Sequence, residues 1–140
     1  MGQKSKLRVL LINVLLFGFL FGLVSLNKEF LRPSLSHIPC MTPVTGSFPN
    51  FIAAYIIGAL FVNGAVAMQP KHSRFLVYPG SLLVFAILTV EEVKPMWGAS
   101  TVYDMLDIIA SGAGSLLAIV TYEWIIHRRK AAAMSANREL

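Results

Sequence analysis

Asp107 is the residue whose position in this sequence most strongly suggests chemistry. It stands in the apolar run 105–114, where a carboxylate is least expected. At the centre of a bilayer a charged side chain costs roughly 2.5–3.5 kcal/mol on insertion scales, so such a residue usually faces protein or water and has a partner. We therefore expect a specific packing or functional role for Asp107. The alternative, a carboxylate that only caps or packs the start of a helix, fits Asp104 better.

Other polar residues are expected to gather near Asp107. Two carboxylates at a membrane interface can serve as general acid and base, and Glu91 with Asp107 forms the candidate catalytic pair. The candidate partners of the Asp107 carboxylate are Lys94, Asn50, Tyr55, or water in a shallow outward-facing cleft. The full predicted polar cluster, as a binding or structural site, comprises Asn50, Glu91, Glu92, Lys94, Asp104, Asp107 and Ser111.

No established catalytic motif accompanies these carboxylates. The chain has no nucleophile with an adjacent base, no phosphate-binding loop and no cluster of metal ligands. His37 is a lone histidine, and Cys40 is the single cysteine, so no disulfide can form within the chain. The sequence predicts no metal site and no cofactor.

The composition indicates an integral membrane protein. Of the 140 residues, 56% are hydrophobic and only 14% are charged, whereas about 25% are charged in an ordinary soluble domain. Four apolar runs approach the length of about 20 residues that a helix needs to cross a bilayer. We predict one all-α membrane domain over residues 1–140, a bundle of four transmembrane helices at 7–26, 51–68, 75–90 and 103–126.

The lysines and arginines predict the orientation of this bundle. Nine of the twelve lie before the first span, between the second and third, or after the fourth, and three lie on the other side. By the positive-inside rule both termini are cytoplasmic, in the inner or plasma membrane. These basic residues lack interleaved aromatics, so nucleic acid is not an expected partner. Residues 27–50 and 91–102 become the outer loops.

Prolines and glycines predict local features of the bundle. Pro33, Pro39, Pro43 and Pro49 are expected to prevent a regular helix in the first outer loop. Pro79, early in the third run, predicts a tilt, a kink or a helix that begins after it.

Small and polar residues predict how the helices pack. Asp107, Ser111, Gly114 and Ala118 follow i, i+4, i+7 and i+11 spacing, so they share one stripe of the fourth helix. Small residues on such a stripe allow close contact with another helix. The other residues with a predicted packing role are Gly18 and Gly22, which form a GxxxG pair or simply face lipid, and Asn63, which reads as an interhelical hydrogen-bond donor or acceptor.

The block 91–118 resembles the core of the VanZ-like family of small bacterial multi-span membrane proteins. In that family a glutamate ends one span, and the next helix opens with an aspartate followed by a glycine; Glu91, Asp107 and Gly114 occupy these positions. Lys94 and Ser111 stand where the family has glutamine and asparagine, and the family's loop arginine is missing. The resemblance covers roughly residues 45–126 and implies a divergent member in a bacterial cell envelope.

Three functions are compatible with these residues. The favoured hypothesis is an accessory or scaffold protein that binds a lipid or a membrane partner through an outward-facing acidic cleft. The first alternative is a membrane-embedded enzyme acting on an envelope lipid or glycan with Glu91 and Asp107, and the second is a small ion- or proton-coupling subunit. The expected partners are the lipid bilayer and either another membrane protein or a second copy of the chain.

Overall fold

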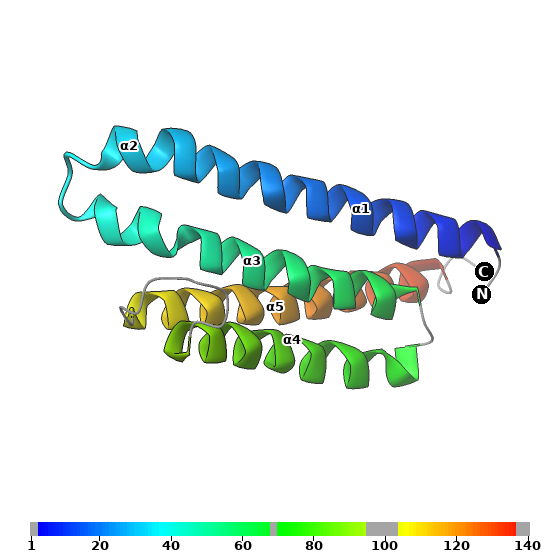
Figure 1. Cartoon of the computed structure of the whole chain (residues 1–140). Coiled ribbons are helices and arrows are strands. Elements are labelled where there is room, and N and C mark those ends of the chain that lie inside the picture. The colour runs from blue at the N-terminus through cyan, green and yellow to red at the C-terminus, as the bar shows by residue number, and fades with distance from the viewer. Residues whose placement is uncertain (1–2, 68–69, 95–103, 137–140) are drawn as a thin grey trace.

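The computed structural model describes residues 3–67, 70–94 and 104–136, which contain helices and no strands (Figure 1). The elements are α1 (Gln3–Leu26), a π-helical turn η1 (Asn27–Leu31), α2 (Arg32–Leu35), α3 (Met41–Val66), α4 (Pro70–Val93) and α5 (Met105–Ala136). Four stretches are long and apolar enough to cross a membrane, namely Leu7–Leu35, Met41–Val66, Ser73–Val93 and Met105–Ala132. The prediction of an all-helical chain with four helices of spanning length is confirmed for these residues.

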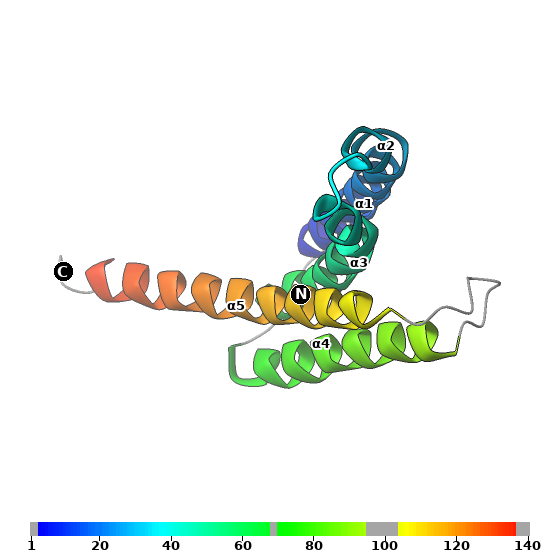
Figure 2. The same cartoon turned by 90° about the vertical axis from the view of Figure 1, so that its left-hand side faces the viewer.

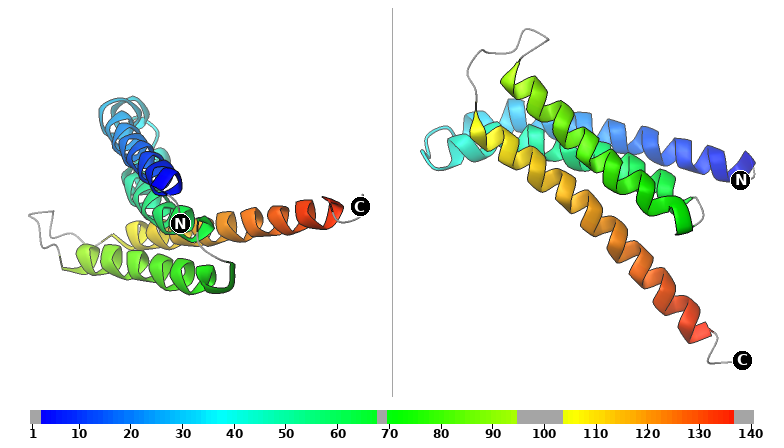
Figure 3. Two further views of the ribbon diagram at one scale, coloured as in Figure 1. Left: turned by 90° about the vertical axis from the view of Figure 1, so that its right-hand side faces the viewer. Right: turned by 90° about the horizontal axis from the view of Figure 1, so that it is seen from below.

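The helix α3 is the centre of the arrangement. It packs against α1, α4 and α5, whereas α1 contacts no long helix other than α3 in the described part of the chain. Viewed end-on, α1 stands over α3 on the side away from the layer formed by α4 and α5 (Figure 2). The helices α3 and α5 run in the same direction, and α5 diverges from α1 and α3 toward its carboxyl end (Figure 3).

The two ends of this arrangement differ in charge. At one end α3 and α5 begin and α4 finishes, close to Glu92, Asp104 and Asp107; we call it the acidic end. At the opposite end α1 and α4 begin and α3 and α5 finish, close to Arg8 and Arg129; we call it the basic end.

Small residues bring α5 directly against the backbone of α3. A Cβ atom on Gly114 would overlap the carbonyl oxygen of Phe51 and lie 2.9 Å from Ala54 Cβ and 3.0 Å from the Tyr55 nitrogen. One turn further, a Cβ on Gly58 would lie 2.7 Å from the Cβ of Ala118, which is fully buried. The helices can approach this closely because glycine has no side chain at either contact.

Toward the basic end the core is closed by larger side chains. Val62 and Ala65 of α3, Val77 of α4 and Tyr122 of α5 form one buried apolar cluster. The Tyr122 hydroxyl lies 2.5 Å from Ser73 Oγ, which satisfies a polar group at the edge of this cluster.

An ion pair joins α4 to α5 next to that cluster. Arg74 Nη2 lies 3.0 Å from Glu123 Oε2, and the Tyr78 hydroxyl donates to Glu123 Oε1 at 2.9 Å. Arg74 and Glu123 are 49 residues apart in the chain, so no helical spacing indicates this pairing.

The first outer loop is the main error of the sequence prediction. Residues 27–50 were expected to lack regular helix, yet only 36–40 do, and α3 begins ten residues earlier than the predicted span at 51. Pro43 lies in the first turn of α3, where backbone N–H groups have no intrahelical acceptor and their loss costs little. Pro33 instead follows directly on the π-helical turn, in a helix that continues from α1 to Leu35. The helices α4 and α5 likewise extend beyond the predicted spans, and α4 continues through Pro79.

Pro49 lies inside α3, and a side chain compensates for its missing N–H. A residue at position 49 would normally donate to the carbonyl of Thr45, four residues earlier, and proline cannot. Asn27 Nδ2 donates to this same Thr45 oxygen at 2.8 Å, from a side chain that is only 1% exposed. The π-helical turn therefore supplies the hydrogen bond that Pro49 removes, which fixes the return of the chain from α1 to α3.

A second polar contact joins α1 to α3 near the basic end. Asn63 Nδ2 donates to Asn13 Oδ1 at 2.6 Å and to the Val9 carbonyl at 3.2 Å, so Asn63 makes an interhelical hydrogen bond. Gly18 and Gly22, by contrast, have no atom within 4 Å of an added Cβ. Among the described residues, this GxxxG pair makes no close helix contact within one copy of the chain.

Replacing Gly114 with alanine should destabilise the fold. The added Cβ would force α5 away from the backbone of α3, and overpacking of this kind costs about 1–3 kcal/mol. Thermal unfolding of the detergent-solubilised protein measures the loss. The matched control is Gly18→Ala, which adds the same methyl group in open space and should be neutral or stabilising by up to about 1 kcal/mol. Equal losses in both variants would contradict the close contact.

The loss of stability caused by Asn27→Ala should depend on whether residue 49 is proline. In the single variant Asn27→Ala, the Thr45 carbonyl has no donor, which should lower the free energy of unfolding by roughly 1–3 kcal/mol. With Pro49→Ala the helix regains its own N–H donor, so the loss of Asn27 should cost less. A double-mutant cycle should give a coupling of roughly 0.5–3 kcal/mol. Additive effects of the two substitutions would rule out this compensation.

Candidate functional site

The acidic end is organised around the start of α5. The Asp104 backbone N–H donates to Glu92 Oε1 at 2.9 Å, which ties the end of α4 to the residue preceding α5. Asp104 Oδ1 in turn accepts from the Leu106 N–H at 2.9 Å. This is the geometry of a helix N-cap, so the capping role expected for Asp104 is the one its side chain performs.

Asp107 lies one turn inside the helix with a different environment. Its backbone N–H donates to the Asp104 carbonyl at 3.2 Å, and its own carbonyl accepts from Ser111 Oγ at 2.9 Å. The side chain is half-buried, and Oδ1 is inaccessible to solvent with no hydrogen-bond partner in the described structure. A buried acceptor without a donor costs roughly 1–3 kcal/mol, so this oxygen is not placed there by folding energy alone.

The structure brings together only part of the predicted polar cluster. Glu92, Asp104, Asp107 and Ser111 are linked in sequence by hydrogen bonds at the start of α5. No hydrogen bond or ion pair between described residues joins Asp107 to the other expected companions, which are Asn50, Tyr55, Glu91 and Lys94. The Tyr55 hydroxyl instead lies 3.5 Å from Thr121 Oγ1, and the exposed Lys94 bonds through its backbone to Val90.

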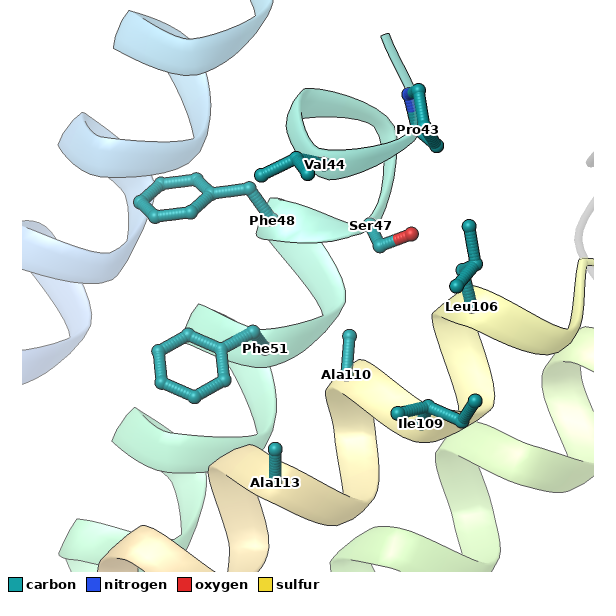
Figure 4. A pocket seen from close by; sticks show the side chains of 9 residues that line it. All are labelled: Pro43, Val44, Ser47, Phe48, Phe51, Leu106, Ile109, Ala110 and Ala113. Atoms are coloured by element: carbon teal, nitrogen blue, oxygen red, sulfur yellow. The ribbon is translucent and has the colours of Figure 1, made fainter. Parts of the chain in front are cut away.

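A groove of about 400 Å³ opens between α3 and α5 beside these residues. We call it the α3–α5 groove. Figure 4 shows its walls, which are side chains from Pro43 to Phe51 of α3 on one side and from Leu106 to Ala113 of α5 on the other. It is lined by Pro43, Val44, Ser47, Phe48, Phe51, Leu106, Ile109, Ala110 and Ala113.

The side chains that line the groove are apolar except for one hydroxyl group. Ser47 is its single polar side chain, and Ser47 Oγ is buried without a hydrogen-bond partner among the described residues. None of the acidic residues of the predicted cluster lines it, so the cleft that was expected to be acidic is apolar. Helical geometry explains this: Leu106, Ile109, Ala110 and Ala113 share one face of α5, while Asp107 belongs to the neighbouring stripe that packs inward.

The acidic residues and the groove are nevertheless adjacent. Leu106, which lines the groove, is the next residue to Asp107 and donates its N–H to Asp104 Oδ1. The site therefore combines a carbon-lined trough with acidic residues next to one of its walls. Such a combination suits an amphiphile, with an apolar chain along the trough and a polar head at the carboxylates. Within the described residues no group of three His, Cys, Asp or Glu side chains is placed to hold a metal ion.

The sequence reasoning missed the residues that line the groove and those that support it. Phe48, Ala110 and Ala113 carry no signal of their own, because apolar residues in an apolar run look alike whether they face lipid or a groove. Asn13 did carry a signal. The first predicted span begins at Leu7 and the second ends at Met68, on the same side. Asn13 lies six residues after that start and Asn63 five residues before that end, so the two amides are expected at similar depth in neighbouring spans.

Comparison with known proteins gives no relative for this site. No family model, no curated protein and no solved structure matches the chain.

Asp107→Asn should leave the protein folded and raise its stability by about 1 kcal/mol. It replaces a half-buried carboxylate with a neutral amide, which is less costly to bury, and this gain should exceed the lost helix-dipole attraction of roughly 0.3–1 kcal/mol. Asp104→Ala should instead lower the stability, by about 1 kcal/mol, because it removes the N-cap of α5. Thermal unfolding of the two variants side by side gives both signs. A clear loss of stability in Asp107→Asn would mean that the carboxylate is a structural group.

Proposed function

We propose that this chain is an integral membrane protein whose four long helices cross the bilayer. Hydropathy and exposed surface support it: α1 has a mean hydropathy of 2.6 over its most apolar window, none of which is buried. Large apolar side chains are exposed along α4 and α5 as well, including Phe75, Leu82, Leu116 and Val120. Hydrocarbon is the solvent that makes such a surface favourable.

We place the basic end, with both termini, in the cytoplasm. The support is the nine-to-three distribution of lysine and arginine between the two ends of the helices. The acidic end, with Asp107 and the α3–α5 groove, then faces outward from the inner or plasma membrane. The resemblance to the VanZ-like family, carried by Glu91, Asp107 and Gly114, belongs to the same proposal and gives the bacterial cell envelope as its setting.

The function that the geometry supports best is that of an accessory or scaffold protein that binds a membrane lipid at its outward end. The α3–α5 groove carries this conclusion, because its lining is almost entirely carbon and it lies next to residues whose carboxylates form no ion pair with any described residue. The lipid would place an acyl chain against Phe51 and Ala110, and a head group with an amine or a hydrogen-bond donor beside Asp107.

The size of the groove is that of a small-ligand site. The groove holds about 400 Å³, which lies within the roughly 300–1,000 Å³ range of small-molecule sites and suits a lipid chain. The hypotheses of an enzyme and of an ion relay gain no support, since Glu91 and Asp107 share no bond in the described structure and Ser111 donates within its own helix.

Filling the groove should abolish lipid binding there. In nanodiscs that contain a lipid with a photoreactive acyl chain, the wild-type chain should crosslink within residues 43–51 and 105–113. Ala113→Trp fills the trough and should reduce this crosslink by on the order of tenfold, which corresponds to about 1.4 kcal/mol. Mass spectrometry of the digested protein locates and quantifies the adducts.

The matched control is Ala86→Trp. Ala86 is an exposed alanine on α4 outside the groove, so the same substitution there should leave the crosslink unchanged. Equal crosslinking of the wild type and both variants would overturn the lipid site. Recovery of a membrane protein that the Ala113→Trp variant alone fails to retain would show that a protein occupies the groove in place of a lipid.

A further inference from the structure

A second cavity opens at the basic end, lined by side chains of three helices. It measures about 410 Å³, and its walls come from α1, α3 and the last turns of α5. Two arginines line it, Arg8 from α1 and Arg129 from α5, together with the amide of Asn63 and the apolar side chains of Val9 and Ile12. The α3–α5 groove contains no charged side chain, so the two cavities differ in chemistry.

Hydrogen bonds hold two walls of this cavity in place. Arg129 Nη1 donates to the carbonyl of Val66 at 3.0 Å, at the end of α3 where carbonyl groups lack intrahelical donors. A guanidinium has five N–H donors, and this bond uses one. Asn63 is held by Asn13 and by the Val9 carbonyl, so α1 and α3 are tied together beside Arg8. The arginines therefore project from a built framework.

The charge around this cavity is strongly positive. Arg8, Arg74, Arg128, Arg129 and Lys130 all lie toward this end, and Glu123 is the one acidic residue that the described part of the chain places there. Glu123 is paired with Arg74 at 3.0 Å, the only ion pair between described residues. Neither Arg8 nor Arg129 has a carboxylate within ion-pair distance in that part of the chain. Two arginines beside one cavity without a carboxylate lack the anion that their fork-shaped guanidinium groups favour.

We propose that this cavity binds a phosphate group, contributed by the head group of an anionic phospholipid. Arg8 and Arg129 would donate hydrogen bonds to the phosphate oxygens. Asn63 would hold α1 against α3 through its bonds to Asn13 and Val9. Val9 and Ile12 continue into the exposed apolar surface of α1, where the glycerol and the first carbons of the acyl chains would lie. The phosphate site rests on the proposed membrane insertion: if the helices cross the bilayer, the ends of the spanning stretches near Leu7 and Val66 place the cavity at the depth of the lipid phosphates. This site does not depend on the α3–α5 groove.

Native mass spectrometry of the full chain released from nanodiscs tests the proposal. With phosphatidylglycerol and phosphatidylcholine in equal amounts, the wild type should retain phosphatidylglycerol preferentially. Arg8→Gln and Arg129→Gln should each lower this retention by on the order of tenfold, since each removes charge-assisted hydrogen bonds to the phosphate. The Arg8 side chain forms no hydrogen bond or ion pair with another described residue, so its variant remains informative if loss of the Arg129–Val66 bond unfolds α3.

The matched control is Arg128→Gln. Arg128 lies over the Trp124 ring, 4.7 Å from its centroid, and does not line the cavity. This variant loses the same charge and should retain phosphatidylglycerol as the wild type does. Equal loss in all three variants would show a diffuse attraction to the anionic surface and overturn the site. Wild-type retention of the two lipids in equal amounts would overturn it as well.

Inorganic phosphate distinguishes the source of the anion. If the cavity is a lipid site, millimolar phosphate added before release should leave the bound phosphatidylglycerol in place, because the apolar contacts of Val9 and Ile12 belong to the lipid alone. Displacement of the lipid by phosphate, in the wild type and the Arg128→Gln variant alike, would overturn the lipid source and assign the cavity to a soluble phosphate compound.

Discussion

The contact of Gly114 with the backbone of α3 is the constraint on which the rest of the arrangement depends. Two helices that run in the same direction cannot be joined by a short turn, so their register must come from the interface itself. The absence of a side chain at Gly114 lets Phe51 and Tyr55 approach, and the Gly58–Ala118 contact continues the same seam one turn on. This seam sets the depth of Asp107 above it and of Tyr122 below it. The α3–α5 groove opens beyond its end, where the facing residues no longer interlock (Figure 4).

Hydrogen bonds, more than apolar packing, attach α1 to the other helices. Most of its large apolar side chains are exposed. In the proposed membrane setting, these side chains would gain no hydrophobic energy by contacting protein instead of lipid. Its position is defined by Asn13 with Asn63 near the basic end and by Asn27 with Thr45 near the acidic end. In both bonds the donor is a side-chain amide, and leaving that amide unpaired in an apolar environment would cost free energy. The two bonds therefore favour one position of α1 relative to α3. A helix held at two polar points presents the rest of its surface to whatever surrounds it.

The two ends of the molecule offer ligands opposite chemistries. At the acidic end, carboxylates stand beside a carbon-lined trough, and the buried Asp107 oxygen has no donor within the described chain. At the basic end, Arg8 and Arg129 flank a cavity while the nearby Glu123 is already paired with Arg74. Among the described residues, neither site has a counter-charge paired with it. A lipid with an amine at one end and a lipid phosphate at the other would supply the missing partners without any catalytic step.

The sequence by itself determined the number of long helices, the small-residue stripe of the last helix and the residue that caps it. Apolar runs of adequate length require helices in a medium without water, so four helices of spanning length followed without tertiary information. The small-residue stripe from Asp107 to Ala118 also followed, because its period is that of a helix. Asp104 was placed as the capping residue on the same local grounds, since an N-cap bonds to a backbone group two or three residues away.

Only the tertiary structure decided which helix packs against the small-residue stripe of α5 and which side chains line the cavities beside that contact. Pro49 predicts a break on local grounds, and the helix continues because Asn27, 22 residues earlier in the chain, reaches the carbonyl that proline frees. Leu106 and Ala110 are indistinguishable from lipid-facing residues until α3 is placed opposite them. Arg8 and Arg129 are 121 residues apart and become neighbours of one cavity only through the packing of α1 and α5 about α3. Local sequence encodes the period of a helix and its caps, whereas grooves and paired charges arise from distances between helices that no local pattern records.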